Sequence, residues 1–204
     1  MSTTPSSTVR RRRITLVMAL AAVVVLVLLS AFVWPHWAVK GQEPSAGTTS
    51  GQSQGQGRPK PKIDAQPLPQ NASELLKAMP DTVADFARTK ADPATEWGSR
   101  TPIEEYTLIY STGQPGKDVT LHLAQWTKAE DARQAYDSLT TGMTGKELAS
   151  GKVKAGGSAT GSYVEKEVAG DAKSAQAVWQ NDTVVFQAQG SKAALEAFYR
   201  AFPL

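Results

Sequence analysis

Histidine is the side chain best suited to acid–base or metal chemistry near neutral pH, and this 204-residue chain has only His36 and His122. A metal site on His122 would need carboxylates to complete its set of ligands. In the alternating stretch 118–126, His122 shares a predicted strand face with Ala124 and Trp126. This position favours a hydrogen-bonded or partly exposed histidine beside Trp126 over a catalytic one.

Carboxylates and hydroxyl nucleophiles form no catalytic pattern in the sequence. Glu104 and Glu105 are adjacent in a predicted strand, so they point to opposite faces and cannot act together as a paired acid and base. The G-x-S-x-G match at 51–55 lies in the predicted disordered linker, so it is not the strand-to-helix elbow of a catalytic serine. The stretch 113–117 lacks the spacing and the Ser/Thr of a phosphate-binding loop. The chain has no cysteine, which excludes thiol catalysis and cysteine metal sites. We therefore expect no enzyme, and the sequence predicts no catalytic residue, cofactor site or metal site.

Three lysines, Lys146, Lys152 and Lys154, gather in the Gly-rich stretch 144–161. We expect this stretch to be a mobile loop with at most a short strand. Its lysines are candidates for contact with an anionic polymer or a lipid headgroup. The alternative interpretation is a solvated loop without a partner.

Alternating apolar residues predict strands at 104–111 and 118–126, joined as a hairpin by a loop with glycine and proline. The stretch 82–90 is ambiguous between helix and strand, and its Val83 and Phe86 favour a strand. Three more strands are predicted towards the C-terminus, the last two joined by a two-residue hairpin at 181–182: 162–168, 175–180 and 183–189.

Helices are predicted before, between and after these strands. The stretch 127–143 has apolar residues at helical spacing, and Thr127 with Glu130 would form a capping box at its start. The predicted helix starts are Asn71 or Ser73, Thr127, and Ser191. The expected fold class is α+β: an antiparallel sheet of about five to six strands with helices packed on one face.

A weak internal repeat is visible, because each half runs strand, hairpin, strand and helix. The two helices open with similar triplets, TKA at 127–129 and SKA at 191–193. Duplication is one interpretation. The alternative is that β-hairpins followed by capped helices are common.

An uncharged apolar run at 14–34 dominates the N-terminal part of the chain. As a helix it would be about 31 Å long, which matches a hydrocarbon core of roughly 30 Å. A secretory signal peptide has a shorter apolar region followed by a small-residue cleavage site. The triplet at 19–21 has the small residues of such a site, but it lies deep inside the apolar run, where cleavage is not expected. The run therefore predicts a permanent transmembrane helix.

The residues beside this run predict its orientation. Arg10, Arg11, Arg12 and Arg13 lie at its N-terminal end, so the positive-inside rule keeps the N-terminus in the cytoplasm. Trp34 and Trp37 would then lie at the outer interface of the lipid bilayer. The predicted parts are a cytoplasmic tail at 1–13, the transmembrane helix at 14–34, a disordered Gly/Ser/Gln/Pro-rich linker at 35–70 and an extracytoplasmic α+β domain at 71–204.

The net charge of +3 could suggest a nucleic-acid partner, but its distribution argues against one. Residues 1–70 carry eight Lys or Arg against two acidic residues, whereas 71–204 carry 14 against 17. The basic excess therefore belongs to the anchor and linker, and we expect no nucleic-acid binding.

The stretch 78–97, the paired strands after it and the segment 124–136 resemble the small membrane-anchored extracytoplasmic domains found widely in actinobacteria. This resemblance implies a single-pass cell-membrane protein and brings no functional residue with it. We expect the outer domain to bind a ligand or a membrane or envelope protein, as a sensor, adaptor or envelope-assembly accessory. The alternatives are an envelope hydrolase or transferase whose site sequence cannot assemble, and a secreted form released by proteolysis in the linker.

Overall fold

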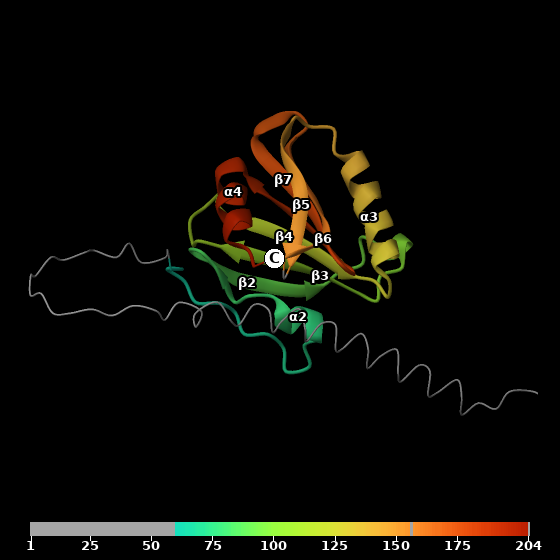
Figure 1. Cartoon of the computed structure of the whole chain (residues 1–204). Helices are drawn as coiled ribbons and strands as arrows, with labels where there is room; N and C mark the ends of the chain where they lie inside the picture. The colour runs from blue at the N-terminus through green and yellow to red at the C-terminus, as the bar shows by residue number, and fades with distance from the viewer. Residues whose placement is uncertain (1–59, 156, 204) are drawn as a thin grey trace, which may run out of the picture. The chain divides into compact units, whose positions relative to one another are not determined.

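The computed structural model describes residues 60–203 apart from residue 156 (Figure 1). No helix in this part of the chain is both long and apolar enough to cross a membrane. The predicted tail 1–13, the predicted span 14–34 and most of the predicted linker lie outside the described residues. The same holds for the six proposed anchor residues: Arg10, Arg11, Arg12, Arg13, Trp34 and Trp37.

An eight-stranded antiparallel sheet forms the centre of the described part (Figure 1). Its strand order is β1-β2-β3-β4-β8-β7-β6-β5, so two four-stranded meanders meet where β4 pairs with β8. The predicted α+β class with an antiparallel sheet is confirmed, but the predicted number of five to six strands is too low. The strands are β1 (Thr82–Val83), β2 (Phe86–Pro93), β3 (Glu104–Ser111), β4 (Val119–Gln125), β5 (Glu147–Ala155), β6 (Ser158–Val168), β7 (Asp171–Asn181) and β8 (Val184–Ser191).

Apolar alternation forms the central strands as predicted. In β4, Val119, Leu121 and Leu123 are fully buried on one face, and His122 lies on the other. Leu108 of β3 pairs with Leu121, so the two strands contribute to the same buried layer.

Two tight hairpin turns lie at the ends of predicted strands. The stretch 82–90 forms β1 and the start of β2, joined by a turn at 84–85, which confirms the strand interpretation. Strands β7 and β8 are joined by a two-residue loop at 182–183, one residue later than predicted. Both turns begin with a residue at positive φ, Ala84 at 50° and Asp182 at 52°.

The Gly-rich stretch 144–161 is not a loop, and that prediction was wrong. It forms β5 and the beginning of β6, which pair as an antiparallel hairpin. A Cβ on Gly161 would lie 2.0 Å from the backbone oxygen of Gln180, and a Cβ on Gly151 would lie 2.8 Å from the ring of Tyr163. These two positions therefore require glycine because neighbouring strands approach them closely, and not because the stretch is a flexible loop.

Helices cover both faces of the sheet (Figure 1), so the prediction of helices on one face was wrong. Ala132 and Ala135 of α3 belong to a core cluster with Val178, whereas Leu195 of α4 belongs to another cluster with Trp179. Val178 and Trp179 are consecutive in β7 and point to opposite faces. The helices are α2 (Glu74–Ala78), α3 (Ala129–Gly142) and α4 (Lys192–Ala201), with a 3-10 turn at Gly98–Arg100.

Two of the three predicted helix starts agree with the structure. Ser73 caps α2, because its Oγ accepts from the backbone N–H three residues on at 3.1 Å, and Ser191 is the N-cap of α4. The capping box predicted for α3 is wrong. Lys128 occupies the N-cap without a side-chain bond, and Glu130 pairs instead with Arg133 along the helix.

Residues 60–70, which we predicted to end the linker, contact the domain. The Gln66 N–H donates to the Arg88 carbonyl at 2.7 Å, and Leu68 packs against the main core cluster. The Arg88 side chain is fully buried on this side of the sheet. Its guanidinium donates to Gln66 O, Met79 O, Pro80 O and Asp81 Oδ1.

Candidate functional site

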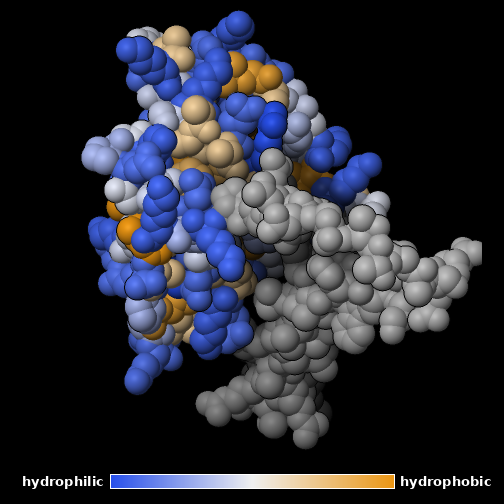
Figure 2. Space-filling model, turned by 90° about the vertical axis from the view of Figure 1, so that its left-hand side faces the viewer, coloured by the Kyte–Doolittle hydropathy of each residue, from blue (hydrophilic) through white to orange (hydrophobic). Residues whose placement is uncertain are grey.

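The described surface is mainly polar. Figure 2 shows mostly hydrophilic residues on the side of the molecule that bears α4, with hydrophobic ones scattered among them. Within the described residues, Ile103 is the only large hydrophobic side chain that is exposed, at 63%. The described surface therefore presents mainly polar groups to the solvent.

A groove of about 460 Å³ lies between the second half of α3 and the hairpin of β5 and β6. Its volume is in the range of small-molecule sites. Hydroxyl and charged side chains provide most of its lining, which includes Tyr136, Thr140 and Thr141 from α3, Glu147, Ser150 and Lys152 from β5, and Ser162, Val164 and Lys166 from β6.

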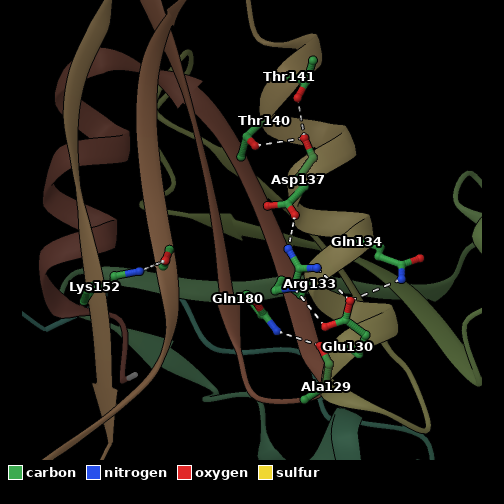
Figure 3. Close-up of polar contacts among 10 residues, drawn as sticks. Ala129, Glu130, Arg133, Gln134, Asp137, Thr140, Thr141, Lys152 and Gln180 are labelled. Atoms are coloured by element: carbon green, nitrogen blue, oxygen red, sulfur yellow. Dashed lines mark hydrogen bonds and ion pairs between the residues drawn. The ribbon is translucent and has the colours of Figure 1, made fainter.

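Small side chains and one glutamine position α3 over the sheet. Ala132 and Ala135 are buried against the sheet, so the helix can approach it closely. At the N-terminal end of α3, Gln180 Nε2 donates to Ala129 O at 3.1 Å and to Asp182 O at 2.8 Å. Figure 3 shows Gln180 of β7 reaching the first turn of α3. Helix α3 is therefore held to β7, the neighbour of the groove-lining strand β6.

Two lysines bring positive charge to the groove. Lys152 Nζ donates to Ser162 Oγ at 3.0 Å across the hairpin. Lys166 Nζ donates to Met143 O at 2.8 Å, at the carboxyl end of α3. The helix has no basic residue in its own last turn, so β6 supplies the cation that this end of a helix dipole favours.

Of the three lysines predicted as anion contacts, only Lys152 lines the groove. Lys146 and Lys154 are exposed and are not among its lining residues. Sequence reasoning missed Lys166, because this residue lies in the predicted strand 162–168 and not in the Gly-rich stretch that was predicted to be a loop. The alternation of Val164 and Lys166 was the available signal, since it puts both side chains on one face of β6.

Hydroxyl groups in the groove differ in their partners, because Thr140 and Thr141 already donate to the Asp137 carbonyl. Burial, and then the carboxylates of Asp137 and Glu147, raise the pKa of Tyr136, so its hydroxyl stays protonated at neutral pH. Glu147 accepts from Ser150 at 2.8 Å. Two lysines and one glutamate line the groove, so its charged groups favour an anion.

The exposed side of α3 carries an ion-pair network that stabilises the helix (Figure 3). Arg133 donates to Glu130 at 2.7 Å and to Asp137 at 2.6 Å. Hydrogen bonds from Arg133 and Gln134 lower the pKa of Glu130 to about 2. The charged groups of this network already form ion pairs with one another, so they are less available to a ligand than the lysines of the groove.

His122 lies in a second polar cluster, on the sheet face that α3 partly covers. Its Nε2 lies 2.7 Å from Glu105 Oε1, and its ring centroid is 4.3 Å from that of Trp97. The predicted hydrogen-bonded histidine is confirmed, although Trp97 and not Trp126 is the aromatic ring that it contacts. Glu104 instead accepts from the Tyr106 hydroxyl at 3.1 Å, so the two adjacent glutamates contact different partners on opposite faces of β3, as predicted.

Comparisons with known proteins give little further information. No protein-family model matches the chain, and no curated protein matches it. Among solved structures, the chain is similar to a GTP binding regulator from Thermotoga maritima, with 11% identity and a TM-score of 0.39, over 59% of this chain and 78% of the other. A likeness this low supports no inference about the activity of this chain.

Proposed function

We propose that this chain is a single-pass membrane-anchored binding protein. Its outer domain would recognise a ligand or envelope component that carries anionic and hydroxyl groups, and it would act as a sensor, adaptor or envelope-assembly accessory. The membrane part of this proposal rests on the uncharged run 14–34 and the four arginines before it. The binding part rests on the groove.

One observation carries the binding proposal: Lys152 and Lys166 approach the same groove from neighbouring strands, among hydroxyl side chains. Ammonium groups attract carboxylate or phosphate, and hydroxyl groups donate to and accept from a polyol. A compact anion on a sugar or polyol would therefore match both parts of the lining.

The double variant Lys152→Gln/Lys166→Gln should weaken binding of an anionic polyol. Suitable probes are glucuronate and glycerol 3-phosphate, titrated calorimetrically into the full-length chain. A hydrogen bond to a charged group contributes about 1.5–3 kcal/mol, so we expect Kd to rise about tenfold or more.

The matched control is Lys146→Gln/Lys154→Gln, which removes the same charge outside the groove and should leave Kd unchanged. Equal weakening by both double variants would indicate unspecific charge attraction and would contradict the groove. A lack of saturable binding by either probe would contradict the anionic part of the proposal.

Membrane anchoring predicts that the full-length chain stays in the pellet after alkaline carbonate extraction. Protease added to cells stripped of their wall should also reach residues 71–204. In the control Val24→Arg/Leu28→Arg, each arginine at the centre of the run would oppose insertion by about 2.5–3.5 kcal/mol, and the chain should become extractable. Release of the unaltered chain at its full mass would refute the anchor, whereas release of a shorter chain would indicate proteolysis in the linker.

The rival function, an envelope hydrolase or transferase, is favoured by one arrangement. Glu105 orients the imidazole of His122, and Thr107 Oγ1 lies 2.9 Å from the other ring nitrogen. A carboxylate, an imidazole and a hydroxyl in this order resemble the parts of an acyl-transfer site. Hydrolase or transferase activity of the wild-type protein, together with its loss in His122→Gln, would favour this function over binding alone.

A further inference from the structure

Three side chains that can bind a metal ion converge outside the groove: Glu96, Glu105 and His122. Each offers one ligand atom, and these atoms lie within 4.8 Å of one another. They come from different parts of the chain, namely the connection between β2 and β3, strand β3, and strand β4.

Glu105 fixes the imidazole of His122 in one orientation. Its side chain is only 3% exposed, and Oε1 lies 2.7 Å from Nε2 of the histidine. The same oxygen accepts from the backbone N–H of Trp97 at 2.8 Å. A carboxylate in this place retains the proton on Nε2, which leaves a lone pair on Nδ1. A carboxylate that orients a histidine in this way is the usual support of a metal-binding imidazole.

Glu96 lies on the other side of the ring. Its Oε2 is 3.5 Å from Nδ1 of His122. Two ligands bound at about 2.1 Å in a tetrahedral zinc site lie about 3.4 Å apart, so an ion fits between these atoms with little movement. Thr107 Oγ1, 2.9 Å from Nδ1, donates to the lone pair when no ion is bound and would turn away from it when one is. Water can complete the coordination, because the Glu96 side chain is 66% exposed.

The segment that carries Glu96 is tied to the sheet on both sides. Ala94 N–H donates to Glu105 O at 2.9 Å, and Trp126 Nε1 donates to Arg100 O at 2.7 Å. Glu96 is therefore on a connection whose ends are fixed, which limits the entropy lost when its carboxylate binds an ion.

Charge also favours a cation at this place. Within the described residues, neither Glu96 nor Glu105 forms an ion pair with a lysine or arginine. With a neutral imidazole, the two carboxylates leave a local charge that a divalent ion would neutralise. The Trp97 ring against His122 shields one side of the site from water, which strengthens this attraction.

We propose that His122 Nδ1 and the Glu96 carboxylate bind a divalent transition-metal ion of the zinc class, with Glu105 as the positioning residue. The nitrogen ligand selects borderline ions such as Zn²⁺ over Mg²⁺ and Ca²⁺, which prefer oxygen ligands. The site does not involve the residues of the groove, so it stands independently of the binding function proposed above, although it shares His122 and Glu105 with the rival one.

Calorimetric titration of ZnCl₂ into the purified full-length chain tests this site. We expect one Zn²⁺ per chain, no saturable binding of MgCl₂, and loss of Zn²⁺ binding in His122→Gln. Glu96→Gln, at an exposed position that should not affect folding, should weaken binding about tenfold or more. Glu105→Gln keeps an oxygen that can accept both hydrogen bonds but removes the charge, and should weaken binding about 10–100-fold.

His36→Gln is the matched control, because His36 is the other histidine of the chain. It should bind Zn²⁺ like the wild type, and so should Lys152→Gln/Lys166→Gln. Nitrogen-15 shifts of the His122 ring should show the proton on Nε2 and the metal on Nδ1. Metal-free Glu105→Gln should have a larger share of the Nδ1–H tautomer than the metal-free wild type. Absence of saturable Zn²⁺ binding, or binding that His36→Gln removes and Glu96→Gln leaves intact, would overturn the proposal.

Discussion

Replacing Arg88 with alanine should lower the free energy of unfolding by about 3–5 kcal/mol, because each buried acceptor that loses its donor costs about 1–3 kcal/mol. The guanidinium is fully buried and donates to the carbonyls of Met79 and Pro80, both at 3.1 Å. Alanine would leave these carbonyls without their donor and would open a cavity beside them. Chemical denaturation of the full-length chain, followed by tryptophan fluorescence, measures the change.

Arg133→Ala is the matched control for Arg88→Ala. Arg133 also forms ion pairs at short distance, with Glu130 and Asp137, but its side chain is 53% exposed. Water and salt replace such surface pairs at little loss, so the unfolding midpoint should stay close to that of the wild type. Equal destabilisation by the two variants would show that burial does not determine the role of Arg88.

Phe198→Ala should destabilise the domain by about 3–5 kcal/mol, the usual loss when a buried phenylalanine is truncated. Phe198 is fully buried on α4. Its ring lies 5.6 Å from that of Phe86, 5.0 Å from that of Tyr110 and 5.3 Å from that of Phe202. It therefore joins the C-terminal helix to strands of the N-terminal meander, and truncation would loosen both halves in a single transition.

Ile103→Ala provides the comparison, because it removes a large apolar side chain that is 63% exposed. Surface changes of this kind usually stay within about 0.5 kcal/mol. Urea midpoints of the two variants, with the wild-type m-value retained, would give the difference. A loss for Phe198→Ala as small as that for Ile103→Ala would contradict the core position of this ring.

Local patterns in the sequence predict the central elements well. The alternation of Leu121 and Leu123 with His122 predicts β4 and its buried face, and the spacing of Leu195 and Phe198 predicts the buried side of α4. Ser73 predicts the start of α2 through its capping oxygen. Each of these signals depends on contacts within a few residues, so the sequence contains it directly.

The wrong predictions concern contacts between distant segments. Gly161 suggests a loop by composition, although its lack of a Cβ allows approach to the Gln180 carbonyl on another strand. The face that α3 covers depends on the path of its connections, which amphipathicity does not determine. Thr127 and Glu130 fit a capping box, but the helix begins after Lys128 and Glu130 pairs with Arg133.

The candidate sites could be predicted only in part from the sequence. His122 and Glu105 could be assigned to strand faces, but the register that joins them comes from the pairing of β3 with β4. Glu96 lies in a connection without periodicity, so no pattern predicts that it returns to His122. Lys166 reaches the groove only because β6 pairs with β5.

The pairing of β4 with β8 has a consequence for biosynthesis. β8 is the last strand before the C-terminal helix, yet it occupies the middle of the sheet. Until β8 reaches it, β4 has an unpaired edge, and such edges promote aggregation with other chains. We therefore expect the N-terminal meander to be prone to aggregation until β8 has paired with β4.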